Sequence, residues 1–196
     1  MKAPIQILIV DDDPDFLFLI QKMLAKHPEF KIAGACRSKQ AAVTMALSTQ
    51  PDIVLMDLNL GASPADGIQA SREIRILTSA KVLILTALEE PEIILRTTKR
   101  AFASGYIFKH QMALLPENIS ALAKGHTAQE YQIAMAALSE LSKAEMSVFQ
   151  SLIGKDIKLH SSPKTIANQT TQILKKLGLD NKKELAHVFR LLCDNS

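Results

Sequence analysis

The sequence predicts an α/β protein, in which a doubly wound, five-stranded parallel sheet is followed by a small all-α domain. Two observations predict the sheet: short runs that are apolar on both faces, and their alternation with helical stretches over residues 1–124. A third observation predicts the second domain, because residues 141–196 have helical periodicity only. With 196 residues, 47% of them apolar, the chain is long enough for two small domains.

The strand pattern occurs five times, and each occurrence is too short for a buried helix. The expected strands are 6–10, 31–36, 53–56, 82–85 and 106–108. The segments between and after them have apolar residues at helical spacing, and Pro14 and Pro28 bracket the first. The expected helices are 16–24, 41–47, 68–77, 92–102 and 115–123.

Composition excludes several classes of protein. The chain has 22% charged residues and a formal net charge of +3, and no run of 18 apolar residues that could span a membrane. Two cysteines make no disulfide framework, and five scattered histidines give no zinc cluster. The N-terminus lacks the pattern of a signal peptide. We therefore expect a cytoplasmic protein without membrane contact.

Polar residues follow four of the five expected strands. Asp11 and Asp12 follow the first strand, and Asp57, Thr86 and Lys109 each end a later one. Parallel strands of such a sheet place their carboxyl ends on one edge, where ligands bind. Three carboxylates, a hydroxyl and an ammonium should therefore converge. The simpler alternative, that the Asp11–Asp13 run is only a solvated turn, does not explain the other three strand ends.

Crowded carboxylates repel one another, and hard oxygen ligands suit Mg²⁺. A bound metal ion would neutralise the cluster and leave one carboxylate free to attack. The sequence thus predicts a magnesium site at this edge of the sheet.

The motifs ILIVDDDP, PDIVLMDLNL, LILTA and GYIFK occur in this order. Through them, residues 5–124 resemble the receiver domain of bacterial two-component response regulators. The resemblance implies a flavodoxin-like fold, a histidine kinase as partner, Mg²⁺ as cofactor and no enzyme activity beyond autophosphorylation and autodephosphorylation.

The same resemblance assigns roles to individual residues. Asp57 corresponds to the phosphoacceptor, and Asp11, Asp12, Asp57 and the backbone carbonyl of Asn59 to the metal ligands. Thr86 and Lys109 correspond to the phosphoryl-contacting pair, and Tyr106 to the switch aromatic; an ordinary surface tyrosine is the alternative for Tyr106. The loop from Asp57 to Gly67 is about two residues longer than is usual in receivers.

Residues 125–140 are expected to be a linker that runs into a helix, and residues 141–196 to form the second domain. Ser142 with Glu145 has the spacing of a capping box, and Ser162-Pro163 starts another helix. Gly178 should end that helix, and Asn181 should cap the last one.

The stretches LSKAEMSVFQSL, SSPKTIANQTTQILKKLGL and NKKELAHVF resemble the LuxR-type helix-turn-helix domain of NarL/FixJ-like regulators. The middle stretch corresponds to the recognition helix, which lies in the major groove. Its residues for DNA contact would be Lys164, Asn168, Gln169, Thr171, Gln172 and Lys175, with Lys176 as a further phosphate contact.

This second resemblance is incomplete. Only ten residues, 153–162, separate the first helix from the recognition helix, about six fewer than in the family, so the supporting helix is shortened to a remnant at Lys155-Asp156-Ile157. Charge is also modest. Residues 125–196 have nine Lys and Arg against seven Asp and Glu, a net charge of +2. The lysines could therefore belong only to a solvated helix face.

The leading interpretation is a transcription regulator, phosphorylated on Asp57 by a histidine kinase, that binds DNA through its C-terminal domain and pairs as a homodimer. Leu185, Val188, Phe189 and Leu192 would be either a dimer surface or core. The alternative is a receiver with a degenerate C-terminal domain that acts through protein contacts or as a phosphate sink. An aspartate-nucleophile phosphohydrolase is a weaker third interpretation, because its capping module and acid/base group are not found.

Overall fold

The computed structural model describes residues 3–60, 65–87 and 89–193 of the chain. The chain divides into two compact units, residues 1–133 and 134–196, which are described separately. Within the described ranges, no helix is both long and apolar enough to cross a membrane.

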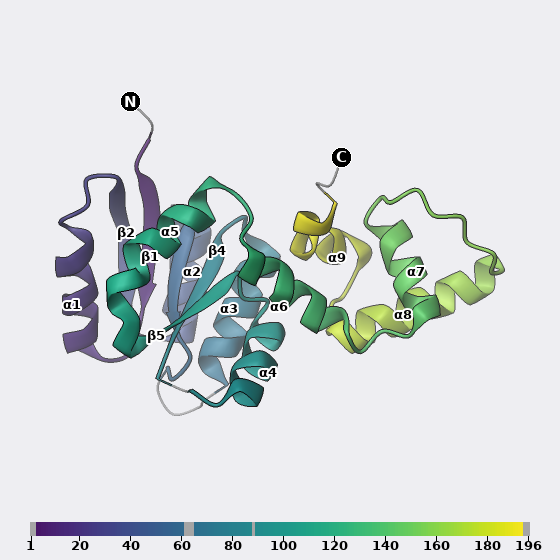
Figure 1. Cartoon of the computed structure of the whole chain (residues 1–196), viewed down its shortest axis with the longest axis horizontal. Coiled ribbons are helices and arrows are strands. Elements are labelled where there is room, and N and C mark those ends of the chain that lie inside the picture. The colour runs from purple at the N-terminus through teal and green to yellow at the C-terminus, as the bar shows by residue number, and fades with distance from the viewer. Residues whose placement is uncertain (1–2, 61–64, 88, 194–196) are drawn as a thin grey trace. The chain divides into compact units, whose positions relative to one another are not determined.

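The first unit is a five-stranded parallel sheet with helices on both faces (Figure 1). Its strands are β1 Ile5–Val10, β2 Phe30–Cys36, β3 Ile53–Asp57, β4 Lys81–Thr86 and β5 Gly105–Phe108. Its helices are α1 Pro14–Leu24, α2 Lys39–Thr49, α3 Asp66–Leu77, α4 Pro91–Ala101 and α5 Leu115–Lys124, and a 3₁₀ segment, η1 Lys109–Leu114, leads into α5. This is the predicted doubly wound fold.

The strands are apolar on both faces because each face covers a separate hydrophobic core. Along β1, Ile7 and Ile9 belong to the core under α1 and α5, whereas Leu8 and Val10 belong to the core under α2, α3 and α4. The strands β1, β3 and β4 lie inside the sheet, so both sets of side chains are removed from water.

The strand order is β2-β1-β3-β4-β5, so the chain crosses from one side of β1 to the other between β2 and β3. At such a switch point the helices depart to opposite faces and leave a crevice beyond the strand ends. The turn after β1 enters that crevice and is fixed by Asp13, which caps α1 by accepting hydrogen bonds from the amides of Asp15 and Phe16.

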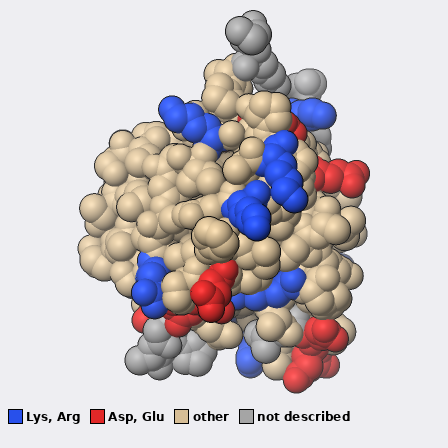
Figure 2. Space-filling view, turned by 90° about the vertical axis from the view of Figure 1, so that its left-hand side faces the viewer, with Lys and Arg blue, Asp and Glu red and all other residues tan. Residues whose placement is uncertain are grey.

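On the side of α1 and β2, the surface of the first unit is not divided into a basic and an acidic half. Figure 2, which views that side, shows largely uncharged surface with basic and acidic groups interspersed.

The second unit is helical. It contains the end of α6 Ala128–Leu138, followed by α7 Lys143–Leu152, α8 Pro163–Leu177, α9 Lys182–Val188 and the 3₁₀ segment η2 Arg190–Leu192. The predicted capping box is present at α7, where Ser142 and Glu145 bond each other's backbone amides at 3.3 and 2.7 Å. Gly178 ends α8 in the left-handed conformation at φ 62°.

The core of the second unit contains the apolar residues of the last helix. Phe189 contacts Phe149 edge to face at a centroid distance of 5.3 Å, and Leu185 and Val188 are buried. Of the two roles predicted for these residues, the structure therefore supports the intramolecular core, and they offer no free face for a dimer.

The remnant of a supporting helix expected at Lys155-Asp156-Ile157 is absent. Residues 155–160 have no regular secondary structure, and Lys155 and Asp156 are exposed. Gly154 turns the chain out of α7 with φ 89°, and the segment that follows has too few apolar residues to bury a helix face.

Candidate functional site

Three carboxylates meet at the carboxyl edge of the sheet. Oxygens of Asp11, Asp12 and Asp57 lie within 4.8 Å of one another. Asp57 is the last residue of β3, while Asp11 and Asp12 follow the neighbouring strand β1. Asp11 and Asp57 are buried, with 0% and 4% of their surfaces exposed, and Asp12 is half-buried. Carboxylates with so little solvent need partners that compensate their charge.

Local hydrogen bonds hold the two aspartates of the β1–α1 turn. The Asp11 backbone amide donates to the Cys36 carbonyl at 3.2 Å, and the Asp11 carboxylate accepts from the Asp13 amide at 3.0 Å. Arg37 donates two hydrogen bonds, of 3.0 and 2.8 Å, to the Asp12 carbonyl. The turn is thus fixed from β2 and from the start of α1.

Lys109 supplies the positive charge of the cluster. Its Nζ lies 2.8 Å from Asp11 Oδ2 and 3.3 Å from Asp57 Oδ2. The same ammonium lies 4.2 Å from the ring centroid of Phe16, a cation–π distance. Lys109 follows β5 directly, so its long side chain reaches across the crevice to the ends of β1 and β3.

The negative charge of the three carboxylates exceeds the positive charge that Lys109 supplies. Burial raises the pKa of Asp57 to about 6, with Asp11 adding to the rise, whereas Lys109 and the Asn59 backbone amide act to lower it. Burial alone would lower the pKa of Lys109, but its bonds to Asp11 and Asp57 outweigh this, and the net shift is upward. One ammonium therefore only partly offsets three carboxylates.

The donor set fits Mg²⁺. Asp11, Asp12 and Asp57 present hard carboxylate oxygens at the edge of the sheet, where Asp12 is only half-buried. A divalent cation bound there would favour the ionised forms of these carboxylates. The backbone amide of Asn59 hydrogen-bonds to Asp57, which places this residue of the β3–α3 loop beside the three carboxylates. Part of that longer loop, residues 61–64, lies outside the described residues.

Thr86 and Tyr106 lie on neighbouring strands. Thr86 is buried at the end of β4 and pairs in register with Phe108, while Tyr106, two residues earlier on β5, pairs with Ile84. The Tyr106 side chain is half-buried and packs against the core under α2, α3 and α4. The backbone of β5 between Phe108 and Tyr106 therefore connects the register partner of Thr86 to Tyr106.

On α8, most of the predicted DNA-contact residues are exposed. The exposed residues are Lys164, Asn168, Thr171, Gln172 and Lys175, whereas Gln169 is half-buried at the margin of this face. Lys176 is engaged elsewhere: its Nζ bonds Glu145 Oε2 at 2.6 Å and the Glu140 carbonyl at 3.1 Å. We define the α8 polar face as the five exposed residues.

Sequence reasoning missed Arg37 and Phe16. Arg37 directly follows the weak second strand, and its place at the same sheet edge is a signal that could have pointed to the cluster. Phe16 has helical spacing in the apolar pattern of α1, which indicates core packing and gives no hint of its contact with Lys109.

Residues 7–120 match the family described as response regulator receiver domain. The chain belongs to this family. The regulator is 24% identical over 202 residues to the transcriptional regulatory protein LiaR of Bacillus subtilis, a match that covers 93% of the regulator and 95% of LiaR. It is also 32% identical over 101 residues to a protein-glutamate methylesterase/protein-glutamine glutaminase of Methanospirillum hungatei; this match covers 52% of the regulator but only 28% of that relative.

Among solved structures, the regulator resembles the RcsB response regulator of Salmonella typhimurium. The TM-score is 0.56 and the identity 25%, and the match covers 96% of the regulator and 99% of RcsB. The likeness to LiaR and RcsB thus extends over both units, whereas the methylesterase relative is matched over only a small part of its length.

Proposed function

We propose that this regulator accepts a phosphoryl group on Asp57 from a histidine kinase and thereby controls DNA binding by its C-terminal unit. The observation that carries the proposal is the buried Asp57, 3.3 Å from Lys109 and within 4.8 Å of Asp11 and Asp12. The exposed α8 polar face and the match to LiaR over both units support the second half of the proposal.

In the transfer step, a carboxylate oxygen of Asp57 forms a bond to phosphorus. The bond from phosphorus to the donor's leaving atom breaks, and the leaving group takes the electron pair. Lys109 stabilises the negative charge of the phosphoryl oxygens, and Asp11 and Asp12 would hold the metal ion. Mg²⁺, when bound, supplies further neutralisation of that charge.

Transmission begins with the new acceptor oxygens at Asp57. They attract the Thr86 hydroxyl, and a shift at the end of β4 changes the space available to Tyr106 on β5. A phosphate on Asp57 thus becomes a change in surface shape on the α4–β5 side. A homodimer of the phosphorylated form and a cytoplasmic location complete the proposal, and the chemistry is limited to gain and loss of this phosphate.

The test uses the α8 polar face. We expect Lys164→Gln combined with Lys175→Gln to lower the slope of log K against log salt by about 1.8, because each phosphate contact adds about 0.9 for duplex DNA. Fluorescence titration of a promoter duplex at several salt concentrations measures the slope. The matched control, Lys182→Gln with Lys183→Gln, neutralises two exposed lysines of α9 and should leave the slope unchanged.

The second candidate function is a receiver that acts by protein contact or as a phosphate sink. The observation that favours it is the absence of helix in residues 155–160, where a helix-turn-helix domain needs its supporting helix. Absence of salt-sensitive DNA binding in the phosphorylated and unphosphorylated forms would overturn the first candidate and favour this one.

A further inference from the structure

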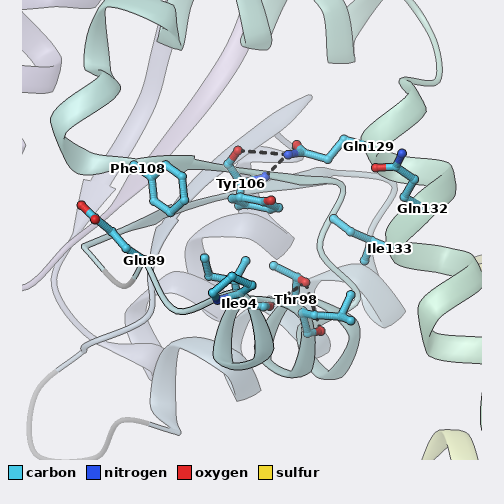
Figure 3. A pocket seen from close by; sticks show the side chains of 10 residues that line it. Glu89, Ile94, Thr98, Tyr106, Phe108, Gln129, Gln132 and Ile133 are labelled. Carbon is cyan, nitrogen blue, oxygen red and sulfur yellow. Dashed lines mark hydrogen bonds between the residues drawn. The ribbon is translucent and has the colours of Figure 1, made fainter.

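The first turn of α6 is attached to the edge strand of the sheet. The Gln129 side chain bonds both backbone groups of Tyr106: its Oε1 accepts from the Tyr106 amide at 3.0 Å, and its Nε2 donates to the Tyr106 carbonyl at 3.4 Å (Figure 3). Because β5 is an edge strand, these groups have no neighbouring strand. Gln129 takes the place that another strand would fill.

A buried ion pair holds the same turn. Glu130 is 2% exposed, and its carboxylate lies 2.9 Å from His126 Nδ1 and 3.1 Å from Lys81 Nζ. Lys81, the first residue of β4, also donates to the Gly125 carbonyl at 2.6 Å. Burial alone would raise the pKa of Glu130, but these partners outweigh it and lower the pKa. The start of α6 is therefore tied to β4 as well as to β5.

Packing adds to these polar contacts. Ile133, one turn after Gln129, is 4% exposed and belongs to the core under α2, α3 and α4. Tyr106, Gln129 and Ile133 line one cavity of about 210 Å³, whose other wall is α4 with Ile94 and Thr98 (Figure 3). A Cβ atom at Gly105 would lie 2.6 Å from Gln129 Oε1, so the Gln129 side chain would have to shift if any other residue stood there. We call His126, Gln129, Glu130 and Ile133 the linker latch.

We propose that the linker latch senses the state of Tyr106 and that a phosphoryl group on Asp57 loosens it. This inference rests on the proposed function. Tyr106 supplies the backbone groups that Gln129 binds and also lines the cavity beside Ile133. When Thr86 moves toward the phosphate, its register partner Phe108 and then Tyr106 shift along β5. This shift lengthens the hydrogen bonds between Gln129 and the Tyr106 backbone. It also moves the Tyr106 ring away from the cavity beside Ile133.

The consequence concerns the second half of α6, because residues after Ile133 continue the same helix into the C-terminal unit. A closed latch makes the first turns of α6 part of the receiver. An open latch makes them part of the connection between the units and lengthens it. Phosphorylation would then control the freedom of the C-terminal unit through the first turns of α6.

Hydrogen–deuterium exchange of the full chain tests the proposal. With Mg²⁺ and beryllofluoride, we expect amides in residues 127–133 to exchange about tenfold faster than in the metal-free protein. Asp57→Asn should show no change. Gln129→Ala should exchange fast in both states, whereas Gln132→Ala, an exposed neighbour on the same helix, should behave as the wild type. Gln129→Asn, whose shorter side chain weakens the latch more gently, serves if Gln129→Ala does not fold.

The outcomes separate the latch from the proposed function. Labelling of Asp57 by acetyl phosphate, measured as the mass of the intact chain, reports phosphorylation independently. Labelling without faster exchange at 127–133, or with slower exchange there, overturns the latch proposal and leaves the proposed function standing. Absence of labelling overturns the proposed function itself.

Discussion

We expect Asp57→Asn to abolish labelling by acetyl phosphate in the presence of Mg²⁺. Asparagine keeps the shape of the buried side chain but offers no anionic oxygen to attack phosphorus. Radiolabelling or intact mass measures the change. Asp180→Asn, the same replacement at an exposed carboxylate of the second unit, should label normally. Labelling of Asp57→Asn at the wild-type level would remove Asp57 as the nucleophile.

We also expect Asp57→Asn to raise the free energy of unfolding of the metal-free protein at neutral pH. The pKa of Asp57 is raised from 3.8 to about 6 in the folded metal-free protein, so folding favours the protonated form. The contribution of Asp57 to stability is therefore largest below pH 4 and is lost as the pH rises through 6. Asp57→Asn should remove this loss and stabilise the metal-free protein at pH 7 by about 3 kcal/mol. Urea unfolding at pH 4 and pH 7 measures the difference, which should shrink at the lower pH.

We expect Gly67→Ala to damage the site through a clash with the backbone. A Cβ atom at Gly67 would lie 2.4 Å from the Asp57 carbonyl oxygen and 2.5 Å from that of Leu58, where no flexible side chain can yield. Overpacking of this kind costs about 1–3 kcal/mol, and alanine's better helix propensity returns at most about 1 kcal/mol. We expect a net loss of about 2 kcal/mol in unfolding free energy and at least tenfold slower labelling of Asp57.

The matched control for Gly67→Ala is Gly125→Ala. A Cβ atom at Gly125 meets nothing within 4 Å, and the φ of 168° is extended backbone that alanine adopts freely. Urea unfolding and acetyl phosphate labelling should both match the wild type. An equal loss of stability and of labelling in both variants would show that the close approach of α3 to the end of β3 is not the cause.

The fold could be predicted from the sequence because its signals are local. The runs before Asp11, Asp57 and Thr86 are apolar on both faces, as strands between two layers of helices must be, and strand ends fix the sheet edge. Two residues sufficed to place the capping box at α7, because Ser142 and Glu145 bond across a fixed three-residue spacing.

What escaped prediction depends on contacts between distant segments. Gln129 and Glu130 lie in a polar stretch that resembles an ordinary linker, and their partners Tyr106 and Lys81 are 23 and 49 residues away. Lys176 looked free for DNA because its partner Glu145 is on another helix. Such side-chain pairs depend on how distant segments pack together, and the periodicity of the sequence gives no information about that packing.

The central claim, that phosphorylation of Asp57 controls DNA binding, is tested most directly by titrating a fluorescent duplex with the wild type and with Asp57→Asn. Each is measured with and without Mg²⁺ and beryllofluoride, at several salt concentrations. We predict salt-sensitive binding by the wild type that the phosphoryl mimic tightens at least tenfold, and no effect of the mimic on Asp57→Asn. Wild-type binding that is equally tight with and without the mimic, or absent at low salt in both states, would contradict the claim.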